Sequence, residues 1–252
     1  MINSAHRVRA AIVAVSFLLA GCGGGTAEKA GPGAGGAPGR HGGATRAPAP
    51  TASRTAAPGR LPGIGPRTLA AIPSRTRQAV VVTGSGRDSS RSTVVLYERT
   101  EAGWTAGPGR PARNALKGWT DHHRSGDLRS PIGVFTLTDA GGLRPDPGTR
   151  LPYDRSGAFT SPGTGFDGEP LAGSFDYVVA VDYNRRPGTT PLDWTRPMGA
   201  GRGGGIWLHV DHGGPTHGCV GLREKDLVEL MRALDPALHP VVVMGDAASL
   251  AR

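Results

Sequence analysis

The amino-acid sequence predicts a mostly β domain after a long N-terminal segment that lacks core-forming residues. Several segments rich in β-branched residues lie between Gly- and Pro-rich breaks, which is the pattern of short strands. Only one segment has the spacing of an amphipathic helix, and strands do not alternate with helices as in a parallel α/β fold. We therefore expect residues 76–252 to form one mostly β domain with one or two helices.

The expected strands follow one another along this domain. They cover residues 78–85, 92–106, 130–140, 175–184, 203–212 and 239–246. A Gly/Ser/Asp-rich turn joins the first two strands. Residues 141–173 are too rich in Gly and Pro for a long element, and a loop of that length more often forms a binding lid or a cleft wall.

The one convincing helix covers residues 222–236. Its apolar residues recur at i, i+3, i+4 and i+7, and Pro236 stops it. These apolar positions are Leu227, Leu230, Met231 and Leu234.

Residues 1–21 have the pattern of a bacterial lipoprotein signal peptide. Arginines precede an apolar stretch that is too short to span a bilayer, which needs about 20 apolar residues. The sequence Leu19-Ala20-Gly21-Cys22 resembles a lipobox, so we expect cleavage before Cys22 and lipidation of its sulfur. In the alternative, the signal peptide is an ordinary one and Cys22 is incidental.

Residues 22–75 contain mostly Gly, Ala and Pro with scattered Arg. Such a segment buries too little apolar surface to offset the entropy of ordering, so we expect a disordered linker after lipidated Cys22. The protein is then exported, anchored to the membrane by its N-terminal lipid, and directed toward the cell wall.

The chain has a formal net charge of +9. No basic block with interleaved aromatic residues is present, and an exported chain does not meet nucleic acid, so we expect no nucleic-acid partner. The charge instead favours anionic lipid and wall polymers. We expect a monomer without a cofactor or a bound metal.

Cys219 is the one cysteine of the expected domain, and it has no partner if Cys22 is acylated. A thiol attacks as the thiolate, so a nucleophilic cysteine needs a nearby base or a positive potential. His209 and His217 precede Cys219 closely, and the dipole of the following helix would favour the anion. Gly218 permits a tight turn whose backbone N–H groups can face an oxyanion. These residues predict an acyl-transfer site.

His209 followed by Thr216-His217-Gly218-Cys219-Val220 resembles the L,D-transpeptidase catalytic domain of the YkuD type. Its signature is an upstream His and then Ser/Thr-His-Gly-Cys and an apolar residue. A second segment of the family, Thr/Ser-Pro-x-Gly-x-Phe, is matched by Ser130, Pro131, Gly133 and Phe135. The resemblance covers roughly residues 76–245.

The resemblance implies a β-sandwich or barrel and an enzyme acting on peptidoglycan stem peptides. Cys219 would be the nucleophile, His209 the general base, His217 a supporting residue and Gly218 a backbone donor to the oxyanion. The thioester would be resolved by a second stem to give a 3-3 crosslink, or by a free amino acid. Resolution by water would be an L,D-carboxypeptidase activity.

This chain departs from the family at two places. His209 lies only ten residues before Cys219, a shorter connection than is usual, and Gly221 stands where many members have Asn or Arg. We therefore expect Thr216 together with Arg202 or Arg223 to contact the substrate. We expect His212, in an Asp-His-Gly-Gly turn, to be a solvated loop residue.

Other interpretations of these residues stay open. Cys219 could be a buried and inert thiol. His209, His212, His217 and Cys219 could hold zinc in a hydrolase, although all four lie within eleven residues. A papain-like or NlpC-type peptidase is disfavoured because only His239 follows the cysteine. The domain could also be a non-catalytic, lipid-anchored peptidoglycan-binding module.

Overall fold

The computed structural model describes residues 60–252. The expected signal peptide, Cys22 and most of the expected linker lie outside the described residues. No helix in the described part of the chain is long and apolar enough to cross a membrane.

In residues 60–252, one mixed sheet of eleven strands forms the framework. Its strands are β1 (Gln78–Gly84), β2 (Arg91–Thr100), β3 (Gly103–Ala106), β4 (Arg110–Arg113), β7 (Gly133–Thr136), β8 (Ala140–Gly142), β9 (Tyr153–Arg155), β10 (Val178–Ala180), β11 (Trp207–Val210), β12 (Val220–Leu222) and β13 (Val241–Asp246). Their order is β7-β13-β1-β2-β4-β12-β11-β10-β8-β9, and β3 pairs with β2. A separate pair consists of β5 (Trp119–Thr120) and β6 (Ser130–Pro131).

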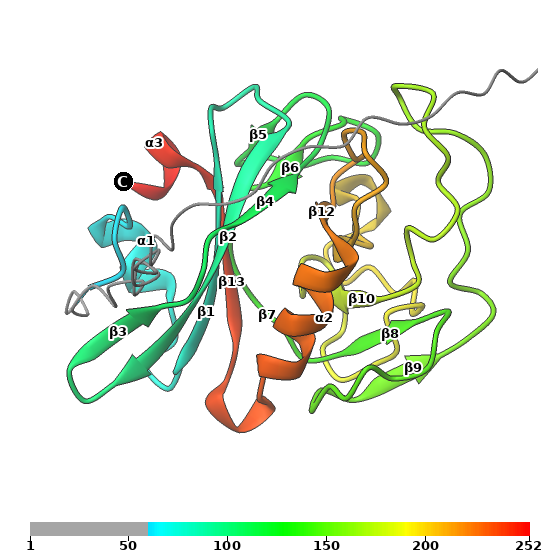
Figure 1. The fold of residues 1–252 in the computed structure, drawn as a ribbon. Helices are drawn as coiled ribbons and strands as arrows, with labels where there is room; N and C mark the ends of the chain where they lie inside the picture. Colours follow the sequence, from blue (N-terminus) through cyan, green and yellow to red (C-terminus); the bar gives the residue numbers. More distant parts are fainter. Residues whose placement is uncertain (1–59) are drawn as a thin grey trace, which may run out of the picture. The chain divides into compact units, whose positions relative to one another are not determined.

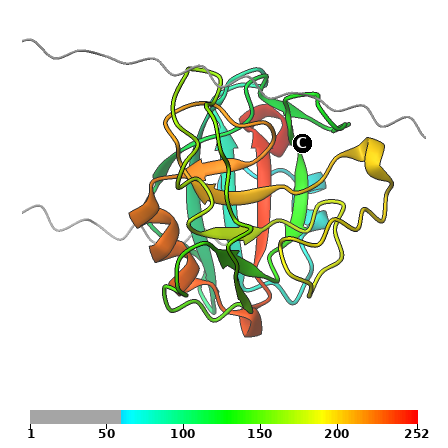
Figure 2. The ribbon, with the colours of Figure 1, turned by 90° about the vertical axis from the view of Figure 1, so that its right-hand side faces the viewer.

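The sheet curls into a half-barrel, so the mostly β expectation is confirmed. Three short α-helices accompany it: α1 (Pro66–Ala71), α2 (Glu224–Ala233) and α3 (Ala247–Leu250). Figures 1 and 2 show the strands curving around α2, while α1 and α3 lie on the outer side of β1 and β13. Two single-turn 3₁₀ helices, η1 (Ala200–Arg202) and η2 (Pro236–Leu238), complete the elements.

Strands β1 and β13 are buried on both faces, which explains their continuous valine runs. Val80 and Val82 of β1 face the main core inside the curl, whereas Ala79 and Val81 face a second core with α3. A strand covered on both sides has an apolar residue at every position rather than at alternate ones. The parallel register of β1 and β13 aligns the same alternation in both strands.

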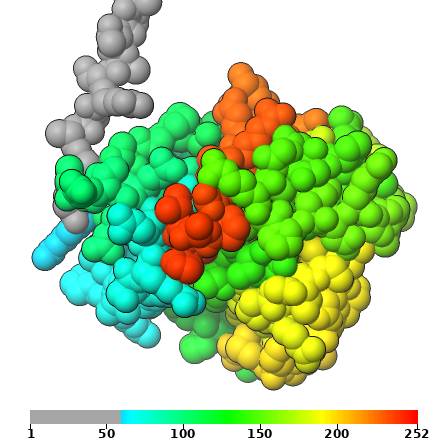
Figure 3. Space-filling view, turned by 90° about the horizontal axis from the view of Figure 1, so that it is seen from below, coloured from blue at the N-terminus to red at the C-terminus, as the bar shows by residue number. Residues whose placement is uncertain are grey.

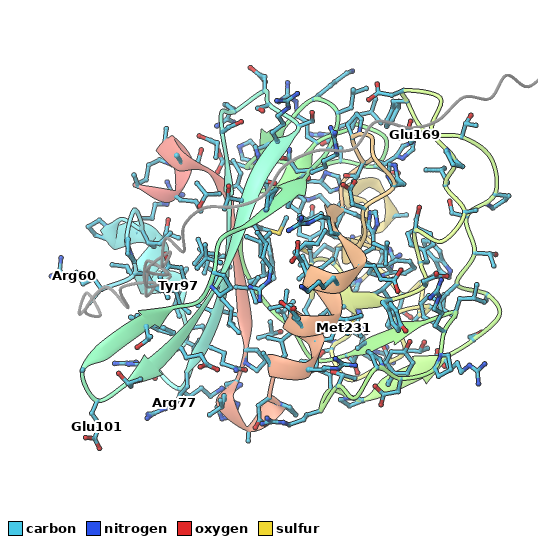
Figure 4. All side chains as sticks on the ribbon, viewed as in Figure 1. Arg60, Arg77, Tyr97, Glu101, Glu169 and Met231 are labelled. Carbon is cyan, nitrogen blue, oxygen red and sulfur yellow. The ribbon has the colours of Figure 1, made fainter. Side chains whose placement is uncertain are left out.

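Helix α2 confirms the helical periodicity seen in the sequence. Leu227, Leu230 and Met231 are buried in the main core, and Leu234 follows at the C-cap. Figure 4 labels Met231 on this helix. The helix begins at Glu224 and ends at Ala233, inside the expected range.

Ordered structure begins earlier than the expected boundary at residue 76. Leu61 and Ile64 are only 2% and 8% exposed, and both lie in the second core. The backbone N–H of Gly65 donates to the Leu250 carbonyl at 2.9 Å. The part of the expected linker from Leu61 onward therefore packs on the domain.

A third core covers the face of β10 and β11 that points away from α2. Phe159, Val178, Ala180 and Trp207 form it, and Cys219 packs against it. This cluster places the single described cysteine beside a rigid part of the sheet.

A cavity that lacks the expected site residues lies near η2 and the start of β13. The space-filling view in Figure 3 shows η2 and the start of β13 at the surface between the N-terminal strands and the region of β8 and β9. A cavity of about 460 Å³ there is lined mainly by prolines and aliphatic residues. It includes none of the site residues expected from the sequence.

Candidate active site

Cys219 lies at the end of the turn that connects β11 to β12. Its Sγ accepts the backbone N–H of Trp207 at 3.4 Å, and its S–H donates to the Gly205 carbonyl at 3.5 Å. Burial raises the pKa of the Cys219 thiol to about 11, against the opposing effect of the Trp207 N–H. The thiol is therefore protonated at neutral pH, and a nucleophilic role requires a base.

The expected help from a helix dipole is wrong. Strand β12 occupies residues 220–222, between the cysteine and α2, which begins only at Glu224. The dipole effect falls off within the first turn of a helix. Burial of the thiol instead raises the pKa of Cys219.

His209 lies on β11 with its side chain on the same face as Trp207. It is 3% exposed, and its ring packs edge-to-face on Phe175 with centroids 5.5 Å apart. Nδ1–H donates to the Val210 carbonyl at 2.8 Å, which leaves Nε2 as the acceptor nitrogen of the neutral ring. Burial lowers the pKa of His209 to about 4, although the Val210 carbonyl opposes this shift.

The strand register places His209 near Cys219. In the parallel register of β11 and β12, Leu208 pairs with Val220 and His209 pairs with Gly221. Continuing this register by one residue places Cys219 opposite Trp207. Cys219 is therefore offset from His209 by two residues along the strands. Strand spacing and rise put the Cα atoms of Cys219 and His209 roughly 8 Å apart. Gly221 has no side chain to intervene. In the described part of the chain, the hydrogen bonds of Cys219 Sγ go to backbone groups and not to His209.

His212 is not the solvated loop residue that the sequence predicted. Its side chain is 6% exposed, and Nδ1 lies 2.8 Å from Oε1 of Glu169. Its ring stacks parallel to that of His209, with centroids 5.8 Å apart and an interplanar angle of 6°. Glu169 comes from the long loop, where Figure 4 labels it. The Gly- and Pro-rich loop thus forms a wall beside the turn that carries Cys219.

His217, Gly218 and Thr216 shape that turn in different ways. The exposed ring of His217 lies against Phe166 of the long loop, with centroids 4.6 Å apart. A Cβ on Gly218 would lie 2.9 Å from Cδ1 of Ile206, so a larger residue here would force the turn or the Ile206 side chain to shift. Thr216 is buried and its hydroxyl donates to the Cys219 carbonyl at 2.7 Å. Thr216 therefore supports the turn, and its expected contact with substrate stays a prediction.

The two arginines considered for substrate binding lie in different places. The side chain of Arg223 is 69% exposed and forms an ion pair with Asp226 at 2.7 Å. It borders a surface depression beside Arg91 and Arg113, and this depression does not include Cys219. Arg202 ends η1, directly before the glycine segment that contacts the thiol, and its carbonyl accepts the Tyr183 hydroxyl at 2.9 Å. Of the two, only Arg202 is near the cysteine.

Cys219 opens onto a cavity of about 170 Å³. Three segments line it: His217 and Gly218 of the cysteine turn, residues 203–206, and part of the loop at 123–128. The lining residues of that loop are His123, Ser125, Gly126 and Leu128. Sequence reasoning missed this loop, although it directly precedes the Ser-Pro-x-Gly-x-Phe segment.

The proposed ligands of a zinc site are not assembled. Among residues 60–252, no group of three or more His, Cys, Asp or Glu side chains is arranged to hold a metal ion. His212 Nδ1 is held by Glu169, and His217 lies on Phe166. The donor set therefore does not favour the zinc hydrolase.

Comparisons with known proteins identify the family of this chain. The family model YkuD, the L,D-transpeptidase catalytic domain, matches residues 77–243. No curated protein matches the chain. A solved structure titled "Structure of Bdellovibrio bacteriovorus Bd1075" is 16% identical and covers 68% of this chain with a TM-score of 0.38. The chain spans about half of that protein, 48% of its length. Because the family model covers most of the ordered domain, the chain belongs to the L,D-transpeptidase catalytic domain family.

Proposed function

We propose that this domain is a cysteine-dependent L,D-transpeptidase that acts on peptidoglycan stem peptides. The observation that carries the proposal is the position of Cys219, which borders a cavity while His209 is held on the neighbouring strand. Family membership supplies the substrate class.

In the first step, Cys219 attacks the carbonyl that joins the diamino acid to the terminal D-Ala. The thiol pKa of about 11 and the His209 pKa of about 4 disfavour a resting thiolate–imidazolium pair. His209 therefore takes the thiol proton as Sγ approaches the carbonyl, in the manner of a general base. The C–N bond breaks, the amine of D-Ala leaves with a proton, and a thioester remains on Cys219.

The developing oxyanion requires donors close to Sγ. Backbone N–H groups at the turn formed by Gly218 and Cys219 are suited to this role, because Thr216 and Ile206 hold that turn in place. Removing one such donor typically lowers kcat by about 10²–10³.

The second step releases the acyl group from Cys219. An amine of a second stem would give a 3-3 crosslink, a free amino acid would give exchange, and water would give L,D-carboxypeptidase activity. The nucleophile forms a bond to the carbonyl carbon, and the C–S electron pair returns to sulfur.

The setting of the enzyme is also proposed. Lipidation of Cys22 and the following linker would hold a monomeric domain in the cell envelope, facing the wall. Cys22→Ser tests this directly, because the variant should leave the membrane fraction or remain unprocessed. Normal maturation and membrane retention of the variant would contradict the lipoprotein assignment.

The activity is tested with purified stem tetrapeptide and mass spectrometry of the products. The unchanged protein should release D-Ala and form a covalent adduct, and Cys219→Ala should do neither. His239→Ala is a matched control, since this residue borders the distant cavity. If the unchanged protein binds peptidoglycan but neither releases D-Ala nor forms the adduct, the domain is a binding module instead.

A further inference from the structure

A second imidazole, that of His123, borders the cavity beside Cys219. His123 is 5% exposed, and it lies on the loop that faces the cysteine turn. A Cβ added at Gly218 would be 3.7 Å from its Cε1, and a Cβ added at Gly203 would be 2.7 Å from its Nε2. Because Gly203 and Gly218 both line the cavity, the Nε2 edge of the ring lies between its walls.

The carboxylate of Asp127 lies beside the other edge of this ring. Its Oδ1 lies 3.0 Å from His123 Nδ1. The carboxylate is fixed in turn, because Oδ1 accepts the N–H of Arg129 at 2.9 Å and Oδ2 that of Arg124 at 2.8 Å. A carboxylate beside Nδ1 favours the proton on that nitrogen, which leaves Nε2 as an acceptor.

We propose that His123 is a second catalytic base, which accepts the proton of the nucleophile that resolves the thioester on Cys219. This inference rests on the proposed transpeptidase function and adds to it. His209 then acts in acylation and His123 acts in resolution.

The different positions of the two histidines favour this division. His209 is not among the residues that line the cavity, and Phe175 and His212 pack against its ring. It is placed to serve the thiol, which directly precedes the adjacent strand β12. An incoming amine or water must enter the cavity, where His123 is the imidazole that has a carboxylate neighbour at 3.0 Å.

The groups around His123 keep it able to accept a proton. Burial lowers its pKa, Asp127 opposes that shift, and the positive charge of Arg202 adds to it. The Tyr183 ring packs edge-to-face on the imidazole with centroids 5.3 Å apart, and His217 and Cys219 share the cavity. At neutral pH the lowered pKa keeps the ring neutral, so one of its nitrogens can accept a proton.

The amine or water nucleophile bonds to the thioester carbon while one of its protons passes to His123 Nε2. The C–S bond then breaks, and its electron pair stays on Cys219 Sγ. The thiolate is reprotonated by an imidazolium of the site, and no oxidant or cofactor takes part.

The test separates acylation from resolution in the full chain. With stem tetrapeptide as donor and a free D-amino acid as acceptor, the initial burst of D-Ala reports acylation and the steady-state rate reports resolution. His123→Gln should keep the burst within about twofold and lower the steady-state rate by about 10² or more, which is the range for loss of a general base. Intact-mass measurement should then show the thioester accumulating. His122→Gln, at the exposed neighbouring position, is the matched control and should leave both rates unchanged.

Two further measurements exclude a merely structural role. Added imidazole should restore resolution in His123→Ala, because the vacated space opens onto the cavity. Asp127→Asn should move the acidic limb of the resolution rate to lower pH, since Asp127 raises the pKa of His123. If the burst falls together with the steady-state rate, if neither falls, or if imidazole rescues nothing in a folded variant, the proposal is overturned. A wild-type chain without any D-Ala burst would refute the transpeptidase function itself.

Discussion

The ring of His212 lies parallel to the ring of His209 at a centroid distance of 5.8 Å, and Glu169 holds its Nδ1 at 2.8 Å. The carboxylate belongs to the long Gly- and Pro-rich loop, whereas the two histidines belong to the end of β11 and the following turn. The orientation of His209 therefore depends on a contact between segments distant in sequence.

His212→Ala should accordingly lower the rate of acylation by about tenfold, because misplacement of a base reduces its effect without removing it. Glu169→Gln should have a smaller effect in the same direction, since the amide retains an acceptor oxygen for Nδ1. The initial D-Ala burst measures both. His217→Ala removes an exposed ring and serves as the comparison; an effect of His212→Ala no larger than that of His217→Ala would contradict the positioning role.

The pH dependence of acylation follows from two shifted pKa values. As the proposed base, His209 can accept the thiol proton only when it is neutral, so the rate should fall as the pH drops through about 4 and should be flat above it. Thiolate forms unaided only as the pH approaches about 11. Acylation by His209→Ala should therefore be slow at neutral pH, and its rate should rise about tenfold per pH unit on the alkaline side. Burst rates measured from about pH 3 to about pH 10 check this, and a flat profile for the variant would assign the base elsewhere.

The sequence predicted some strands well because their residues specify them locally. β1 and β13 are runs of valine, and burial on both faces requires such runs. β4 and β12, with the sequences Arg-Pro-Ala-Arg and Val-Gly-Leu, have no such local signal and are strands only because neighbours pair with them. The missed β12 also explains the mistaken helix dipole at Cys219.

The candidate site could likewise be predicted only where its residues lie close together in the sequence. Cys219 and His209 stand in one short motif, so the sequence alone indicated them. His123 lies some 80 to 96 residues before the other cavity walls, at positions 203–219, and only the fold brings it to the cavity. His212 was misjudged because its partner Glu169 comes from a loop without regular periodicity.

Truncation of the N-terminal residues should show where the domain begins. A chain starting at residue 70 loses Leu61 and Ile64 from the second core, together with the Gly65 bond to Leu250. Burial of each aliphatic side chain is worth about 1.5–3 kcal/mol, so the free energy of unfolding should fall by about 3–6 kcal/mol. Urea unfolding measures the loss, and a chain starting at Arg60 is the control. Equal stability of the two chains would restore the boundary near residue 76.

The contact between Gly218 and Ile206 allows a test of whether acylation depends on the exact position of the turn that carries Cys219. In Gly218→Ala the new methyl would stand 2.9 Å from Cδ1 of Ile206, so the turn carrying Cys219 or the Ile206 side chain must shift. Reactive groups displaced by as little as about 1 Å can cost about 10² in rate, so acylation should fall by one to two orders of magnitude. Ile206→Val removes the colliding Cδ1 and costs about 0.5–1.5 kcal/mol by itself. In the double variant, the burst rate should recover most of the loss caused by Gly218→Ala. If the double variant is instead as slow as Gly218→Ala alone, the glycine is required for another reason, such as access of the substrate to the backbone N–H groups of the turn.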